Sequence, residues 1–130
     1  MKTSIARHWV ALALLSFSCG AVAQAWPVKP VRIVVPFAAG GTTDVVARIV
    51  GQKLGELWGQ SVVIENRGGA GGNIGADAVA KSTPDGYTIL MTSGSIFTVN
   101  PALYKKMPFD AQKDFIPVTN VALGQGQGLT

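Results

Sequence analysis

Apolar and polar residues along the chain follow two alternating patterns, which predict strands and helices in turn. Residues 31–37 form a run rich in β-branched side chains, typical of a strand buried on both faces. Residues 45–58 instead carry apolar side chains at helical spacing. The same unit returns as a strand over 61–66 and a helix over 73–79, and a third strand is expected over 87–92. The pattern predicts an α/β fold with a parallel sheet.

The remaining segments predict less regular structure. Residues 100–104 have the composition of a short helical turn, and residues 115–119 start a fourth extended segment. The tail over 124–130 is rich in Gly and Gln and leads to no helix. Because an alternating pattern would require another crossover at this point, we expect a truncated domain.

The first 23 residues have the three parts of a secretory signal peptide. Residues 1–8 are polar and basic, residues 9–22 are almost wholly apolar, and Ala21-Val22-Ala23 supplies the small residues that cleavage requires. The apolar run is shorter than the roughly 20 residues that span a bilayer. We therefore expect export, with cleavage after Ala23 and with Ala25 as the second choice.

Removal of this segment changes both the chemistry and the charge. Cys19 and His8 both lie within it, so the mature chain has neither residue type. A disulfide framework, a cysteine metal site and a cysteine nucleophile are excluded, and the serines lack a histidine to activate them. The net charge of +4 includes Lys2 and Arg7, so about +2 remains, with scattered basic residues. A nucleic-acid binder would show a basic cluster.

Each predicted strand ends in a loop of small and polar residues, at 38–43, 68–73 and 92–95. In open α/β sheets, ligands bind at the carboxyl ends of the strands. The first two loops lead into helices, whose N-termini attract anions, and glycines let a ligand approach the backbone closely. The spacing leaves two interpretations open: a grip on a carboxylate, or tight turns with close helix–strand packing.

Nucleotide-binding motifs fit the glycine loops poorly. A dinucleotide fingerprint that starts at Gly69 and includes Gly71 would need a third glycine where Ile74 stands. Residues 75–82 imitate a P-loop apart from Ala80, but they lie inside a predicted helix. The acidic residues are spread over different elements, so we expect no metal site, no cofactor and no catalytic residue.

Several ordered motifs resemble the Bug-type receptors, which are the solute-binding proteins of tripartite tricarboxylate transporters. The resemblance covers essentially the whole mature chain. Its motifs follow the family order at residues 26–37, 40–44, 65–75, 84–88, 100–104 and 113–119.

The resemblance implies a type II periplasmic binding protein fold, whose two lobes close on a small carboxylate. Residues 24–130 would be the N-terminal portion of lobe I, with the second lobe absent. The implied ligand-binding residues are Phe37, Ala38, Gly40, Gly41, Thr42, Thr43, Asp44, Gly71, Gly72, Asn73 and Ser93. For Asp44, a purely structural role at a helix terminus stays open.

The resemblance also implies a periplasmic location and two partners, a small carboxylate and the membrane subunits of the transporter, with no nucleic acid. Two alternatives to a working receptor remain: a non-functional receptor fragment, and a small α/β enzyme that binds an anionic substrate. For Gly41 and Gly72 we expect that alanine lowers affinity with little loss of stability, because both glycines would face the ligand.

Overall fold

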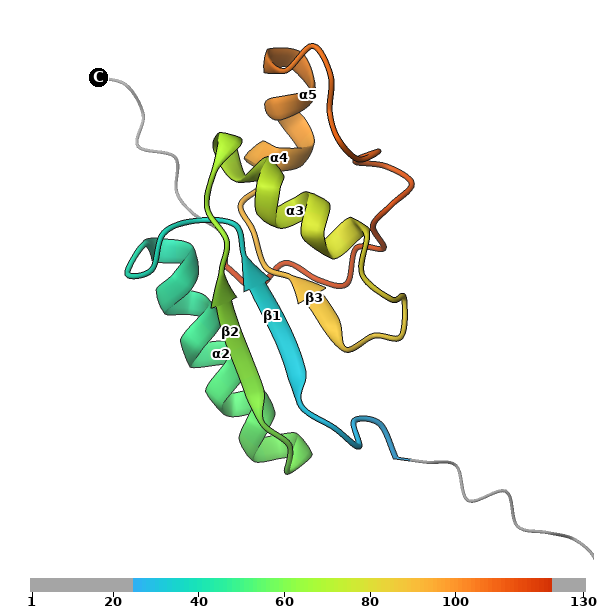
Figure 1. Ribbon diagram of the computed structural model, residues 1–130. Coiled ribbons are helices and arrows are strands. Elements are labelled where there is room, and N and C mark those ends of the chain that lie inside the picture. The colour runs from blue at the N-terminus through green and yellow to red at the C-terminus, as the bar shows by residue number, and fades with distance from the viewer. Residues whose placement is uncertain (1–24, 123–130) are drawn as a thin grey trace, which may run out of the picture.

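The computed structural model describes residues 25–122 (Figure 1). Three parallel strands form its sheet: β1 (Val31–Val35), β2 (Val62–Asn66) and β3 (Thr88–Leu90), in the order β2-β1-β3. The predicted parallel sheet is confirmed, although β3 is shorter than expected. The predicted signal peptide (1–23) and the tail (124–130) lie outside the described residues.

β1 occupies the centre of the sheet and is buried from both sides. Its register aligns Ile33 with Ile64 on β2 and with Ile89 on β3. Parallel neighbours in register place their side chains on the same face, so these three isoleucines form one apolar row. Val34 and Val35 point to opposite faces and are both buried, which explains why this strand is apolar apart from the half-buried Arg32.

Two helices cover opposite faces of the sheet (Figure 1). On one face, α2 (Thr42–Trp58) buries Ala47 against Ile33 and Val35. On the other face, α3 (Asn73–Ala80) buries Ala76 in a cluster with Ile96 and Phe109. The predicted helices are confirmed, and α2 ends at Gly59 as expected, with a left-handed φ of 63° that glycine adopts readily.

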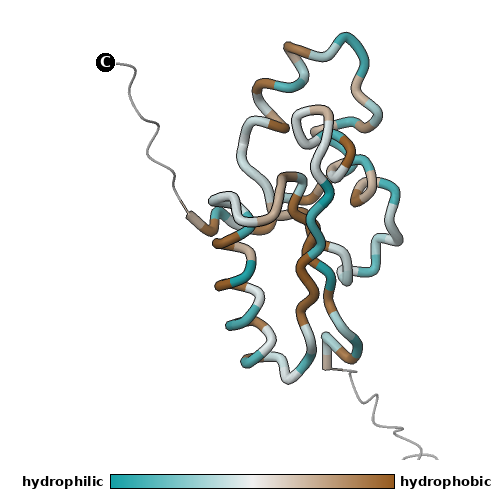
Figure 2. The backbone as a smooth tube through the Cα atoms, turned by 60° about the vertical axis from the view of Figure 1, so that its left-hand side comes forward, coloured by the Kyte–Doolittle hydropathy of each residue, from teal (hydrophilic) through white to brown (hydrophobic). Residues whose placement is uncertain are grey.

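Hydropathy follows this layering (Figure 2). The hydrophobic stretches of the tube run through the sheet, whereas α2 alternates between hydrophobic and hydrophilic positions along its length. This alternation is typical of a helix with one buried face. Among residues 25–122, no helix has the length and hydrophobicity that crossing a bilayer requires.

The C-terminal part of the described chain is less regular than the rest. It contains the predicted short helix, α5 (Asn100–Leu103), and a second one that was not predicted, α4 (Ser95–Thr98). The extended segment expected at 115–119 pairs with no strand of the described residues, so it adds no fourth strand to the sheet there. Phe115 packs into the core, but Ile116 and Val118 are 90% and 85% exposed.

Candidate ligand-binding site

The three loops at the carboxyl ends of the strands meet at one edge of the sheet, because the strands are parallel (Figure 1). We call residues 36–41 the first loop, residues 67–72 the second loop and residues 91–94 the third loop. The Arg67 N–H donates to the Val35 carbonyl at 2.8 Å, and the Met91 N–H donates to the Val34 carbonyl at 3.0 Å. The second and third loops are thereby anchored on either side of β1.

The first loop leads directly into the start of α2. The N-cap residue of this helix is Gly41, and no side chain of residues 25–122 caps it. The N–H of Val45 donates to the Gly41 carbonyl at 3.0 Å, but those of Thr42, Thr43 and Asp44 find no protein acceptor in the described chain. Unpaired N–H groups at a helix start attract anions.

Asp44 lies beneath this loop and is 2% exposed. Its Oδ2 accepts hydrogen bonds from Arg48 Nε at 3.0 Å and from the Gly40 N–H at 2.8 Å, and its Oδ1 accepts one from Asn66 Nδ2 at 2.9 Å. The hydrogen bond from Arg48, followed by those from Gly40 and Asn66, lowers the pKa of Asp44 to about 2. The carboxylate is therefore ionised at neutral pH, and protein groups engage both of its oxygens.

Asn66 connects the end of β2 to the first loop. Its Nδ2 donates to the Phe37 carbonyl at 3.2 Å as well as to Asp44, and its Oδ1 accepts from Arg48 Nη2 at 3.2 Å. Neither Asn66 nor Arg48 is among the residues that the sequence predicted for the site. The available signals were the four-residue spacing of Asp44 and Arg48 on a helix and the polar end of an otherwise apolar strand.

The second loop satisfies its own N–H groups to a greater extent. The N–H groups of Gly72 and Ile74 donate to the Gly69 carbonyl at 2.9 and 3.5 Å, and that of Asn73 donates to the Ala70 carbonyl. These bonds form a single turn of 3₁₀-helix, η1 (Ala70–Gly72), where the sequence suggested a flexible loop. The start of α3 therefore offers a ligand fewer free donors than the start of α2.

Gly72 faces the protein core. A Cβ on this residue would lie 2.6 Å from Ile96 Cδ1, and its φ of 92° is one that other residues rarely adopt. Contrary to the expectation from the sequence, alanine here should cost stability, because Ile96 fills the site of the missing side chain. Gly41 differs: its φ is −73°, and a Cβ would approach only the Ala38 carbonyl oxygen, at 3.4 Å.

Asn73 also turns its side chain inward. It is 4% exposed, and its Oδ1 accepts a hydrogen bond from Asn100 Nδ2 at 2.7 Å. The same Nδ2 donates to the Gly71 carbonyl at 3.0 Å. The amide of Asn100 therefore ties the second loop to α5.

The third loop presents hydroxyl groups to solvent. Ser93 is exposed, and its Oγ lies 2.8 Å from Ser95 Oγ at the start of α4. Either hydroxyl can donate to the other, so one hydrogen of the pair stays available to a ligand.

The predicted site residues divide by exposure. The exposed ones are Ala38, Gly40, Gly41, Thr42, Gly71 and Ser93, the half-buried ones are Phe37 and Thr43, and the buried ones are Asp44, Gly72 and Asn73. Within the described part of the chain, no group of three His, Cys, Asp or Glu side chains is placed to hold a metal ion. The exposed set offers backbone N–H groups and hydroxyls, which suit an anion that accepts hydrogen bonds.

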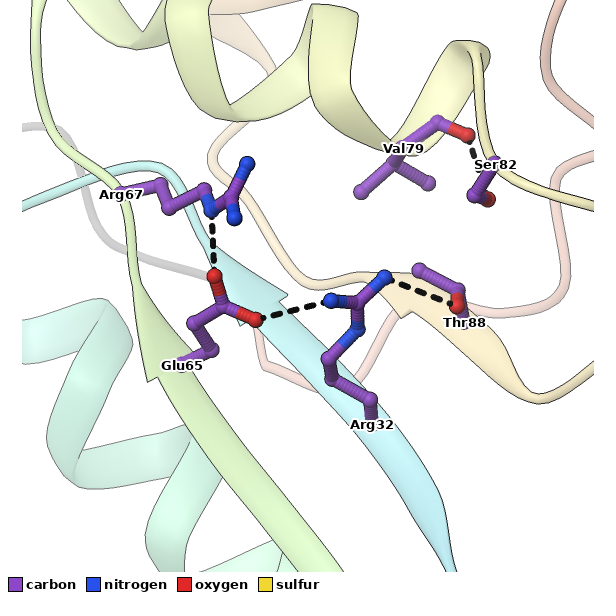
Figure 3. Close-up of polar contacts among 6 residues, drawn as sticks. All are labelled: Arg32, Glu65, Arg67, Val79, Ser82 and Thr88. Atoms are coloured by element: carbon purple, nitrogen blue, oxygen red, sulfur yellow. Dashed lines mark hydrogen bonds and ion pairs between the residues drawn. The ribbon is translucent and has the colours of Figure 1, made fainter.

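An open hollow of about 460 Å³ lies away from these loops, near the amino ends of β1 and β3. Its lining includes Arg32, whose side chain lies across the sheet (Figure 3). Arg32 donates from Nη1 to Glu65 Oε2 at 3.1 Å and from Nη2 to Thr88 Oγ1 at 3.4 Å, and Glu65 also pairs with Arg67.

The other cations of this hollow are paired too. Lys29 lies 3.0 Å from Asp85, and Lys81 lies 2.7 Å from Asp77. Because neighbouring carboxylates compensate these positive charges, the hollow attracts an anion less than its lysines suggest. The start of α2 is the stronger candidate for an anion site.

Comparison with known proteins identifies the family. Residues 46–127 match the family described as the tripartite tricarboxylate transporter family receptor. Protein BugT of Bordetella pertussis is 45% identical over 100 residues, which are 76% of this chain and 31% of BugT.

Solved structures agree with this match. A structure described as a periplasmic transporter is 52% identical with a TM-score of 0.71, over 74% of this chain and 32% of that one. MatC from Rhodopseudomonas palustris with bound malate is 42% identical with a TM-score of 0.68, over 72% and 32%. Another R. palustris protein, solved with adipate, is 46% identical with a TM-score of 0.64, over 66% and 29%.

The chain spans about a third of the length of these relatives. The periplasmic binding protein BugD is also similar, at 45% identity and a TM-score of 0.63. The similarity to these solved structures confirms the fold expected from the sequence. The parallel sheet with its two covering helices is therefore part of a periplasmic binding protein fold. The chain belongs to the family of tripartite tricarboxylate transporter receptors.

Proposed function

We propose that this chain forms part of a periplasmic receptor that captures a small carboxylate for a tripartite tricarboxylate transporter. The observation that carries the proposal is the start of α2, where the N–H groups of Thr42 and Thr43 have no acceptor in the described chain. The partial positive charge of a 17-residue helix adds to their attraction for an anion. The malate and adipate bound by two relatives are both dicarboxylates.

In this proposal the carboxylate lies against the first loop, where Gly41 leaves room beside the backbone. Thr42 and Thr43 donate from their N–H groups, and Ser93 reaches the ligand from the third loop. The buried members of the predicted set act indirectly: Asp44 holds the first loop, and Gly72 and Asn73 hold the second. The match to a family of transporter receptors supports a receptor over the enzyme alternative.

The chain spans about a third of its relatives, so it carries part of the contacts that a closing receptor makes. Losing about 4 kcal/mol of contacts weakens affinity roughly a thousandfold. We therefore expect this chain to bind a dicarboxylate only weakly. The signal peptide over 1–23, the periplasmic location and the transporter's membrane subunits as partners complete the proposal.

Ligand-observed NMR tests it, because saturation transfer detects weak binding. Malate and adipate should receive saturation from the chain, and this saturation transfer should decline as citrate is added as a competitor. Glucose and the neutral diamide of malate serve as controls and should receive none. Equal transfer to glucose, or none to any di- or tricarboxylate, would refute carboxylate capture by this chain.

A further inference from the structure

We propose that Arg48 and Asn66 are positioning residues for the ligand site, an inference that rests on the proposed function. Together with Asp44 they form a closed ring, which we call the loop ring. The loop ring fixes the first loop and neutralises the Asp44 carboxylate beside the anion site. Neither Arg48 nor Asn66 needs to touch the ligand.

The loop ring is closed because each of its three side chains bonds to the other two. Arg48 Nε lies 3.0 Å from Asp44 Oδ2, Asn66 Nδ2 lies 2.9 Å from Asp44 Oδ1, and Arg48 Nη2 lies 3.2 Å from Asn66 Oδ1. A fully satisfied polar network of this kind holds its members in one arrangement.

The loop ring grips the first loop at two points. Asn66 Nδ2 donates to the Phe37 carbonyl at 3.2 Å, and the Gly40 N–H donates to Asp44 Oδ2 at 2.8 Å. The intervening residues, 38 and 39, are exposed. These two bonds tie the loop to the start of α2, in addition to the packing of Phe37 against the core and the hydrogen bond from the Gly41 N–H to the Ala38 carbonyl at 3.4 Å.

The loop ring also reduces the electrostatic repulsion between Asp44 and a bound carboxylate. A carboxylate bound at the N–H groups of Thr42 and Thr43 would lie within one helical turn of the ionised and buried Asp44. Water screens a buried charge poorly, so Asp44 alone would repel the ligand and compete with it for the helix N-terminus. Arg48 supplies the compensating charge. Because Arg48 is 53% exposed, its removal leaves the core intact.

Two measurements separate the two roles of the loop ring. Amide hydrogen exchange at Gly40, without ligand, reports whether the loop is held. The initial slope of ligand-induced amide shifts against malate concentration reports relative affinity in the weak-binding regime. The variants are Asn66→Ala, Arg48→Gln and the double variant Arg48→Gln with Asp44→Asn. Arg67→Gln is the matched control, since Arg67 is another half-exposed, ion-paired arginine near the same loops.

Asn66→Ala should accelerate Gly40 exchange by about tenfold or more, the effect of losing a local closing interaction. Arg48→Gln should reduce the malate slope about fivefold or more, as expected when a nearby charge is left unpaired. The double variant should recover most of that slope, because Asp44→Asn removes the repelling charge while the oxygen of the new amide can still accept the Gly40 N–H. Arg67→Gln should change either quantity less than about twofold, as is typical of exposed ion pairs.

Three results would overturn the inference. Unchanged Gly40 exchange in both Asn66→Ala and Arg48→Gln would show that the ring does not hold the loop. A double variant that binds as weakly as Arg48→Gln would refute charge compensation, as would equal losses in Arg48→Gln and Arg67→Gln. If malate causes no amide shifts in the unaltered chain, the proposed function is refuted, and so is charge compensation by Arg48. Amide exchange at Gly40 still decides whether the loop ring holds the first loop. If Asn66→Ala unfolds, the exposed Arg48→Gln variant answers both questions.

Discussion

Asn73 and Asn100 share a hydrogen bond of 2.7 Å although they stand 27 residues apart, and both side chains are almost fully buried. The first opens α3 and the second opens α5. Because Asn100 also donates to the Gly71 carbonyl at 3.0 Å, one amide fixes the second loop against the C-terminal part of the described chain. The glycine-rich second loop is therefore held in place by a polar contact.

Asn100→Ala should destabilise the fold by about 1–3 kcal/mol, because the buried Asn73 Oδ1 loses its donor and the Gly71 carbonyl loses its hydrogen bond to the same amide. Urea unfolding followed by circular dichroism measures the change. Asn120→Ala, at an exposed position, is the control and should stay within about 0.5 kcal/mol of the unaltered chain. Equal stability of the two variants would show that the buried amide pair contributes nothing.

Gly72→Ala should destabilise the fold by about 2–4 kcal/mol, because the new Cβ meets Ile96 and the φ of 92° is strained for alanine. Thermal unfolding of Gly72→Ala, Gly41→Ala and Gly72→Ala combined with Ile96→Val measures it. Gly41→Ala should be nearly neutral in stability. The combined variant should lose less than the sum of its single changes, since Ile96→Val removes the clashing Cδ1. If the stability losses of Gly72→Ala and Ile96→Val simply add in the combined variant, the loss in Gly72→Ala does not come from contact with Ile96.

Stability should depend on pH through Asp44. Its pKa is about 2 in the folded chain, below the ordinary value of 3.8, so the ionised carboxylate stabilises the fold above about pH 4. This contribution should decline between pH 4 and pH 2 and be absent below pH 2. The stability difference between the unaltered chain and Asp44→Asn should shrink over the same range. An NMR titration that places the Asp44 midpoint near 4 would contradict the hydrogen bonds described.

Export should remove the first 23 residues. Their basic start, apolar run and Ala21-Val22-Ala23 site predict a periplasmic product that begins at Gln24. Mass spectrometry of the intact protein, recovered from the periplasm of an expressing Gram-negative bacterium, gives the N-terminus directly. A folded, soluble product that retains Met1 would refute the signal peptide.

Local patterns predicted the fold well wherever the physical cause was itself local. The apolar run of β1 reports burial on both faces, and Gly59 permits the left-handed conformation that ends α2. The extended segment expected at 115–119 forms no strand in the described chain, because a strand requires a neighbour to pair with, and a sequence run does not supply one. Ile116 and Val118 have the composition of a strand without such a neighbour.

The site was harder to predict than the fold, because its roles depend on contacts between distant residues. The sequence places the first loop directly before α2, but it does not show that Asp44 points inward to Asn66, 22 residues away. Likewise, Gly72 and Gly41 look alike in a glycine-rich motif, and only the position of Ile96 distinguishes them. Residues that hold a site in place leave a weaker sequence signal than residues that face a ligand.

The central claim is that a carboxylate binds at the start of α2, and protein-observed NMR tests it most directly. Malate would be titrated to high millimolar concentration into the ¹⁵N-labelled chain, with sodium chloride at matched ionic strength as the control. The largest amide shifts should occur at Thr42, Thr43 and Asp44, with smaller ones at Ser93. Shifts concentrated at Arg32, Lys81 and Thr88 would instead place the anion in the hollow at the opposite edge of the sheet and contradict the account.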